Sequence, residues 1–155
     1  MKAISLWQPW ASLWAVGRKR NETRHWPTNY RGPLLIHAAK TFCSDVPIEL
    51  RDVLVDQFGI RWALDLPRGA LVGICELEYC VRTEGITIDD DEAAQGNFSE
   101  GRFAWGARAA RLFQRPIPYR GAQGFFDIPD HLVAEAAGIV GAFYVPPASP
   151  QGSLI

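Results

Sequence analysis

The sequence predicts an α+β domain, a small curved β-barrel of five or six mostly antiparallel strands with helices packed at its ends. Two observations support this fold class. Five or six segments read as strands and only two as well-formed helices. Glycines also fall inside the predicted strands, which is typical of the bulges and bends of a barrel. Within the 155 residues we expect one domain over residues 1–142 and a flexible tail over residues 143–155.

Two helices are expected in the N-terminal half. The first covers PWASLWAV: Pro9 stands at the first helical position, where its missing N–H costs nothing. Gly17 follows its end, where glycine takes the left-handed conformation freely. The second helix is predicted over Val46–Phe58 from its apolar spacing, with Ser44 as N-cap and Gly59 as its stop.

The strands are predicted from short apolar segments bounded by turn residues. They are Ala3–Leu6, Glu22–Trp26, Gly32–Ala39, Gly69–Val81, Phe103–Phe113 and Gly124–Ile128. The run Arg115-Pro116-Ile117-Pro118 is expected to break the fifth strand. Residues 83–101 are acidic and irregular, which indicates a long surface loop with a short helix, and Asp130–Ala137 is a further short helix candidate.

The charges are segregated along the chain. The net charge of −1 by itself argues against a nucleic-acid binder. However, residues 15–40 and residues 101–126 each carry a net charge of +5, and the remainder sums to −11. Two interpretations stay open: a strongly dipolar surface that binds an anion, or oppositely charged segments that neutralise each other across the fold.

Several classes of protein are disfavoured by the sequence. No run of about 18 apolar residues predicts a membrane span, and the N-terminus lacks the features of a signal peptide. The three cysteines have no metal-like spacing and are expected to be reduced thiols of a cytoplasmic protein. No phosphate-binding glycine loop, zinc spacing or Ser/His/Asp motif is recognisable, so we expect neither metal nor cofactor.

The basic segment GRKRNETR carries a family resemblance. Gly17, Lys19, Glu22 and Arg24 match the G-x-K-x-x-E-x-R signature of the ASCH (activating signal cointegrator homology) domain family of the PUA-like superfamily. The blocks SLWQPWAS, PTNYRGPLLIHA, GALVGI, GRFAW and GFFDIP also resemble that family, so the resemblance covers residues 3–130. It implies a PUA-like barrel, a cleft that holds the motif, and binding of RNA or another nucleic acid. Some relatives are hydrolases of nucleic acids or nucleosides.

Within the motif, strand geometry predicts the pairing. Glu22 and Arg24 share one face of an extended strand, so Glu22 is expected to hold Arg24 and to leave Lys19 free to project toward an anionic ligand. If the domain is an enzyme, Lys19 and Glu22 are the candidate catalytic residues. Gly17, Glu22 and Arg24 are the expected structural residues of the motif.

Aromatic and basic side chains supply the other candidate contacts to nucleic acid. The rings that could stack on bases are Trp7, Trp10, Trp26, Tyr30, Phe103 and Trp105, with core packing as the alternative for each. Trp26 and Tyr30 flank polar turn residues and are favoured for exposure. The predicted nucleic-acid-binding residues are Lys19, Arg24, Trp26, Tyr30, Arg31, Lys40, Arg108, Arg111 and Arg120.

Other titratable residues have simpler interpretations. His37 lies among apolar residues and is favoured as a core histidine, and His25 is either a surface residue or an adjunct of the motif. Glu76 and Glu78 share one strand face. They either form an acid/base pair or, as we favour, lie on the solvent-exposed face of a sheet.

Two functional hypotheses follow, each for a domain expected to be a monomer. The first is a nucleic-acid-binding domain for RNA or for an unpaired or modified base. The alternative is a small metal-independent hydrolase of RNA or of a modified nucleoside. In the amidohydrolase branch of the family a threonine stands where this chain has Glu22, which argues against assigning the amidohydrolase activity to this chain. Relatives also tend to be more acidic just after the tryptophan, where this chain has Arg108, and the added positive charge favours an anionic ligand. A protein-interaction module, which would need an exposed apolar patch, is a third reading.

Overall fold

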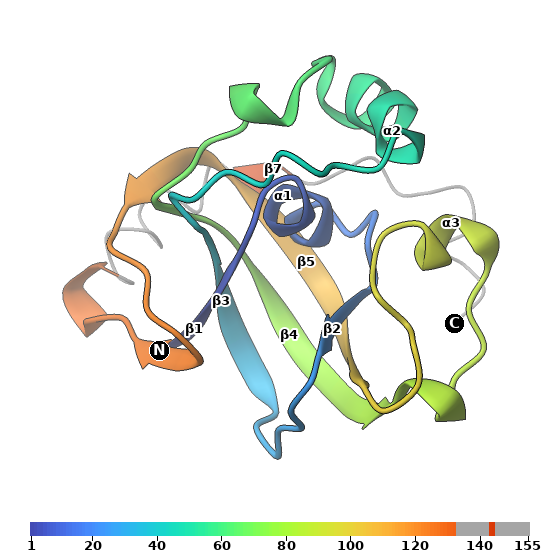
Figure 1. Ribbon diagram of the computed structural model, residues 1–155. Helices are drawn as coiled ribbons and strands as arrows, with labels where there is room; N and C mark the ends of the chain where they lie inside the picture. Colours follow the sequence, from blue (N-terminus) through green and yellow to red (C-terminus); the bar gives the residue numbers. More distant parts are fainter. Residues whose placement is uncertain (133–142, 145–155) are drawn as a thin grey trace.

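The computed structural model describes residues 1–132 and 143–144, which form one strongly curled sheet with helices at one end and one side (Figure 1). The strands are β1 (Lys2–Leu6), β2 (Asn21–Arg24), β3 (Gly32–Ala38), β4 (Ala70–Arg82), β5 (Phe103–Pro118), β6 (Phe125–Asp127) and β7 (Phe143–Tyr144). The helices are α1 (Trp10–Ala15), α2 (Glu49–Phe58) and α3 (Asp90–Ala93), with 3₁₀ turns η1 (Ala63–Asp65) and η2 (Thr83–Gly85). None of the helices in this part of the chain could span a membrane.

The sheet follows the order β2-β5-β4-β3-β1-β6, and β7 adds to β5. The pair β1–β3 is parallel, and every other strand pair within the described residues is antiparallel. Irregularities in the long β4–β5 ladder and one in β3–β4 bend the sheet. The predicted fold class, a curved and mostly antiparallel barrel with helices, is therefore confirmed.

The helix α1 packs into the concave face of this sheet. Its residues Ala11 to Ala15 are all buried, and it contacts β3, β4 and β5. Gly73 on β4 makes this contact possible, since a Cβ atom there would lie 2.7 Å from Cβ of Ala15 and 2.5 Å from the carbonyl oxygen of Arg111. The helix therefore rests directly on the backbone of the sheet.

Two expectations about element ends are wrong. Ser44 does not cap α2: the N-cap residue is Ile48, and the Ser44 hydroxyl lies 3.4 Å from the Asp45 carboxylate. The Arg115–Pro118 run does not break β5, which continues to Pro118, opposite Ala70. Proline is tolerated there because β5 pairs with β4 on one side, while β7 reaches only Leu112 and Phe113 on the other.

The end of the chain is described only in part. β7, at Phe143–Tyr144, pairs with Phe113 and Leu112 of β5 and falls inside the segment expected to be a flexible tail. Residues 133–142 and 145–155 lie outside the described residues, as does most of the helix expected over Asp130–Ala137.

The two edges of the curled sheet meet through side chains. Trp26, just after β2, packs edge-on against Phe125 of β6 with ring centroids 5.6 Å apart, and Phe125 stacks on the buried Trp105 of β5 at 5.4 Å. The Arg24 guanidinium of β2 donates to the carbonyl oxygen of Ser5 on β1 at 2.7 Å. These contacts close the barrel where the described residues form no β2–β6 ladder.

Candidate functional site

The GRKRNETR segment forms a tight turn between α1 and β2. Gly17 has φ +77°, as predicted for the residue that stops the helix. The chain then folds back onto the helix, because the backbone N–H of Lys19 donates to the carbonyl oxygen of Leu13 at 3.0 Å. This reversal places the Lys19 side chain on the inner side of the turn.

Lys19 is buried rather than free. Its side chain is 1% exposed, and its Nζ lies 2.9 Å from Oε2 of Glu22. Nζ also donates to the carbonyl oxygen of Asn21 and lies 6.0 Å from the ring centroid of Trp14. The expectation that Lys19 projects unpaired is therefore wrong, because the fold-back at Gly17 directs the ammonium group into the protein.

Glu22 lies between two cations. Its Oε1 forms an ion pair with Nε of Arg24 at 3.1 Å, although the geometry is not that of a hydrogen bond, while its Oε2 faces Lys19. The predicted shared face of Glu22 and Arg24 is thus confirmed. The trio Lys19, Glu22 and Arg24 carries a net charge of +1, and its carboxylate is 13% exposed.

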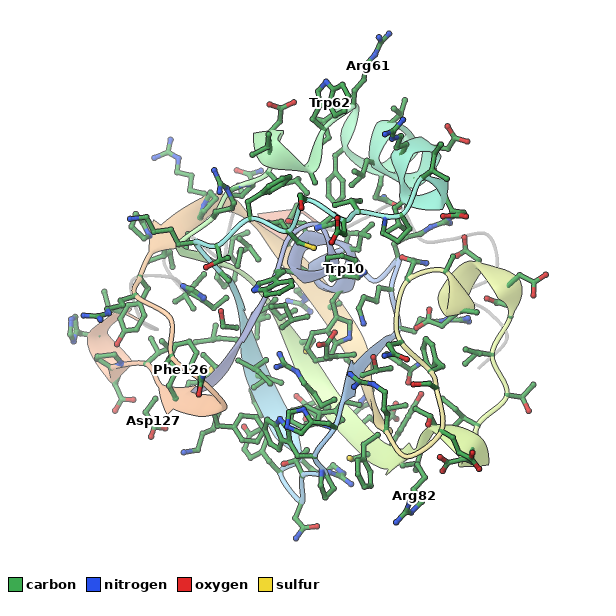
Figure 2. All side chains as sticks on the ribbon, viewed as in Figure 1. Trp10, Arg61, Trp62, Arg82, Phe126 and Asp127 are labelled. Atoms are coloured by element: carbon green, nitrogen blue, oxygen red, sulfur yellow. The ribbon has the colours of Figure 1, made fainter. Side chains whose placement is uncertain are left out.

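The trio lines a cleft of about 540 Å³, which we call the motif cleft. Figure 2 labels one of the lining residues, Trp10, which is the first residue of α1. Besides the trio, the walls of the motif cleft are formed by Ser5, Leu6, Trp7, Trp10, Thr23, His25, Pro47, Arg102 and residues 94–97. Trp7 is 52% exposed. Arg102 donates to the carbonyl oxygens of Thr23 and Asn97, each at 3.1 Å, so its charge is fixed beside the cleft.

The acidic loop clamps the back of the motif. Glu92 is buried, and its Oε1 accepts the backbone N–H groups of Arg20 and Asn21 at 3.0 and 2.7 Å. Arg20 also pairs with Asp89 at 2.9 Å, and Arg18 pairs with Asp91 at 2.8 Å. For Arg18 and Arg20, the neutralisation of one charged segment by the other is therefore the interpretation that the structure supports.

A hydrogen bond orders the loop that carries this clamp. Asp89 caps α3 by accepting the backbone N–H of Glu92 at 2.8 Å. That bond, together with the guanidinium of Arg20, lowers the pKa of the Asp89 carboxyl. The cap fixes the backbone from which the Glu92 side chain reaches the motif.

Replacing Glu92 with alanine should destabilise the domain by about 3 kcal/mol, because a buried carboxylate that accepts two backbone N–H groups makes charge-assisted hydrogen bonds worth about 1.5–3 kcal/mol each. The measurement is urea unfolding. Asp90→Ala, at an exposed position of the same short helix, is the matched control and should change stability by less than about 0.5 kcal/mol. If the two variants unfold at the same urea concentration, the Glu92 carboxylate does not stabilise the motif.

Trp26 and Tyr30 lie away from the motif cleft. Both are half-buried. Trp26 packs against Trp105 at 4.6 Å and Tyr30 against Phe125 at 5.5 Å between ring centroids. The expectation that these two rings are exposed, which was drawn from the polar turn residues beside them, is wrong. Among the aromatic candidates, the exposed ring beside the motif is Trp7.

The other predicted cations are dispersed. Arg31 is exposed and donates to the carbonyl oxygens of Thr28 and Tyr30. Arg108 is exposed and lies 3.9 Å from Glu78, and Arg111 is exposed on β5. None of these three arginines, nor Glu76 or Glu78, lines the motif cleft.

The two remaining predicted cations, Lys40 and Arg120, both line a second cleft. Sequence reasoning did not select Arg102 or Glu92 as site residues, and it named Trp7 as one of several possible stacking rings while favouring Trp26 and Tyr30. Arg102 and Glu92 were visible only as members of charged segments. Their contacts with the motif span more than 70 residues of sequence.

A family comparison agrees with this geometry. The model of the ASCH domain matches residues 4–116. The chain belongs to the ASCH domain family. Activating signal cointegrator 1 from Homo sapiens is 36% identical over 83 residues, which are 50% of this chain and 14% of that protein. The Mus musculus protein matches with the same values, so this ASCH domain corresponds to a small part of these relatives.

Solved structures show the same fold. A tyrosine-to-phenylalanine variant of the Zymomonas mobilis ASCH protein superposes with a TM-score of 0.52 at 15% identity, covering 88% of this chain and 96% of that one. A serine-to-alanine variant gives 0.51 at 15% identity, with 89% and 94% covered. This ASCH domain therefore has the PUA-like fold. Within the described residues no group of His, Cys, Asp and Glu side chains could hold a metal ion.

Proposed function

We propose that this ASCH domain binds RNA by holding one unpaired nucleotide in the motif cleft. The observation that carries the proposal is the exposed Trp7 beside the Lys19–Glu22–Arg24 trio in one cleft. At about 540 Å³ the cleft is within the range of about 300–1,000 Å³ for small-ligand sites. The ASCH family is generally linked to RNA binding, which supports this class of ligand.

Each part of the motif cleft matches one part of a nucleotide. The Trp7 ring offers a stacking face for a base, which is how proteins hold unstacked bases. Arg24 and Arg102 place positive charge beside the cleft for a phosphate. The Glu22 carboxylate can accept an N–H or O–H group from the base or ribose. Lys19, being buried, acts by fixing that carboxylate and not by direct contact.

Replacing Trp7 with alanine should weaken binding of a single-stranded RNA by about 1–3 kcal/mol, the usual worth of one stacked base. Fluorescence anisotropy with a labelled oligonucleotide measures this. Trp62→Ala is the matched control, since Trp62 is also exposed (61%), and it lies near η1, outside the motif cleft (Figure 2). Equal affinities for the Trp7→Ala variant and the wild-type protein would refute stacking at this site.

Binding should also weaken steeply as salt rises, because each phosphate neutralised by a cation releases condensed counterions. The affinity is measured between about 50 and 200 mM salt, the interval over which such interactions lose most strength. An affinity that stays constant over this interval would point instead to a neutral small molecule as the ligand.

The second candidate function is hydrolysis of RNA or of a modified nucleoside. The observation in its favour is the contact of 2.9 Å between Lys19 and Glu22 inside the cleft, which couples a carboxylate to a proton donor. Incubation with mixed RNA and modified nucleosides, read out for both retention and product, separates the two functions. Product that is lost in a folded Lys19→Met variant with RNA binding retained would favour the enzyme.

A further inference from the structure

A second cleft of about 640 Å³ is also lined by Ser5, which contributes to the motif cleft as well. It shares only Ser5 with the motif cleft and is lined by His37, Lys40, Thr41, Tyr119, Arg120 and Gly121, among others. Its lining includes two cations, Lys40 and Arg120, and no carboxylate. The cleft therefore favours an anionic molecule.

At this cleft a serine hydroxyl meets a histidine. Ser5 and His37 are register partners on the parallel strands β1 and β3. Oγ of Ser5 lies 2.9 Å from Nδ1 of His37, and Nε2 of His37 lies 2.7 Å from the carbonyl oxygen of Tyr119. His37 is buried, and this burial lowers its pKa, so the imidazole is neutral at pH 7.

The partners of His37 determine where its proton lies. A carbonyl oxygen only accepts, so Nε2 must carry the hydrogen that is donated to Tyr119. In the neutral ring Nδ1 then has a lone pair, and the Ser5 hydroxyl donates to it. The Ser5 hydroxyl proton is therefore directed at Nδ1 of His37, and the carbonyl oxygen of Tyr119 orients the ring through Nε2. This is the arrangement that activates a serine nucleophile.

The backbone of Gly121 lies close to both Ser5 and His37. A Cβ atom at position 121 would lie 2.6 Å from Cε1 of His37 and 3.2 Å from Oγ of Ser5. Any larger residue would therefore press on the serine–histidine pair. With glycine in this position, the half-exposed Ser5 is left among the lining residues of the cleft.

We propose that Ser5 is a nucleophile, with His37 as its general base, and that the second cleft accepts a carboxylic ester whose acyl group carries a negative charge. Oγ of Ser5 attacks the carbonyl carbon while its proton passes to Nδ1 of His37. The bond to the leaving oxygen then breaks, and the leaving alcohol takes that proton, which gives an acyl-serine. Water, deprotonated by the same nitrogen, releases the acid and restores Ser5. Lys40 and Arg120 attract the charged acyl group.

The test uses mono-4-nitrophenyl succinate, a charged ester, and 4-nitrophenyl acetate, a neutral one. Wild-type protein should release nitrophenolate and carry a succinyl group on the Ser5 peptide by mass spectrometry. His37→Gln keeps an acceptor and a donor but no base, so acylation should slow by about 10²–10⁴-fold. Lys40→Ala should slow the reaction of the succinate ester by a larger factor than that of the acetate ester. Ser99→Ala, which removes a hydroxyl bound to the Asn97 amide, should change neither rate.

Three results would overturn the proposal. They are the absence of acylation at Ser5 in the wild-type protein, acylation that is unchanged in a folded His37→Gln variant, and acylation that Ser5→Ala does not remove. Because RNA binding is tested separately through Trp7, failure of one proposal leaves the other standing.

Discussion

Glu22→Ala is expected to destabilise the domain by about 3–5 kcal/mol, the usual cost of removing one partner of a buried ion pair. The Lys19 ammonium is 1% exposed and has Glu22 as its carboxylate. Without that carboxylate the ammonium is a buried charge with one carbonyl oxygen, that of Asn21, as its remaining polar partner in the described contacts. Arg24 loses its carboxylate in the same substitution. Urea unfolding measures the loss.

Two further variants make this result specific. Glu78→Ala removes a carboxylate that is 53% exposed and 3.9 Å from Arg108, and such a surface pair is worth about 0–1 kcal/mol. The double variant Lys19→Met with Glu22→Leu removes both charges and should recover much of the stability lost in Glu22→Ala. If Glu22→Ala is as stable as Glu78→Ala, the ion pair does not hold the motif together. Lys19→Ala should also melt early, since Lys19 is buried.

Gly106→Ala is expected to cost about 3 kcal/mol or more, at the upper end of what overpacking a core costs. The added Cβ atom would lie 1.9 Å from Cζ of Tyr79, whose ring crosses Gly106 on the neighbouring strand. The Tyr79 hydroxyl donates to Oδ1 of Asn21 at 2.6 Å, so displacing the ring also breaks a link between β4 and β2. A thermal melt of the variant provides the measurement.

The control for this variant is Gly85→Ala, where an added Cβ atom meets nothing within 4 Å and stability should change by less than about 0.5 kcal/mol. Combining Gly106→Ala with Tyr79→Ala should cost less than the sum of the two, because both act on one contact. An additive double variant would place the damage somewhere other than the Tyr79 ring.

The positions of strands β1 to β6, the helix stop at Gly17 and the pairing of Glu22 with Arg24 were predictable because each depends on neighbours in the sequence, although the end of β5 was not. Periodicity of two puts Glu22 and Arg24 on one face wherever the strand lies. The burial of Lys19 was not predictable, since it depends on how the turn folds back against α1. Nor was Glu92, whose contact with Asn21 spans 71 residues.

The aromatic residues show the same limit. Trp7 and Trp26 both stand beside polar or turn residues in the sequence, yet one is exposed and the other packs on Phe125. The difference arises because the curl of the sheet brings β6 over Trp26 and leaves Trp7 at the cleft. A tertiary contact of this kind leaves no pattern in the local sequence.

Arg24 belongs to two parts of the molecule at once. Its guanidinium faces Glu22 in the motif cleft and also donates to the Ser5 carbonyl across the seam between β2 and β1. A seam fastened by side chains opens at a lower free energy than a continuous backbone ladder. A ligand that drew Arg24 toward its own phosphate would remove one of the contacts that close that seam, whereas one that engaged Glu22 and left Arg24 in place would keep it. Arg24 therefore takes part both in the proposed ligand site and, beside the rings of Trp26 and Phe125, in the closure of the barrel.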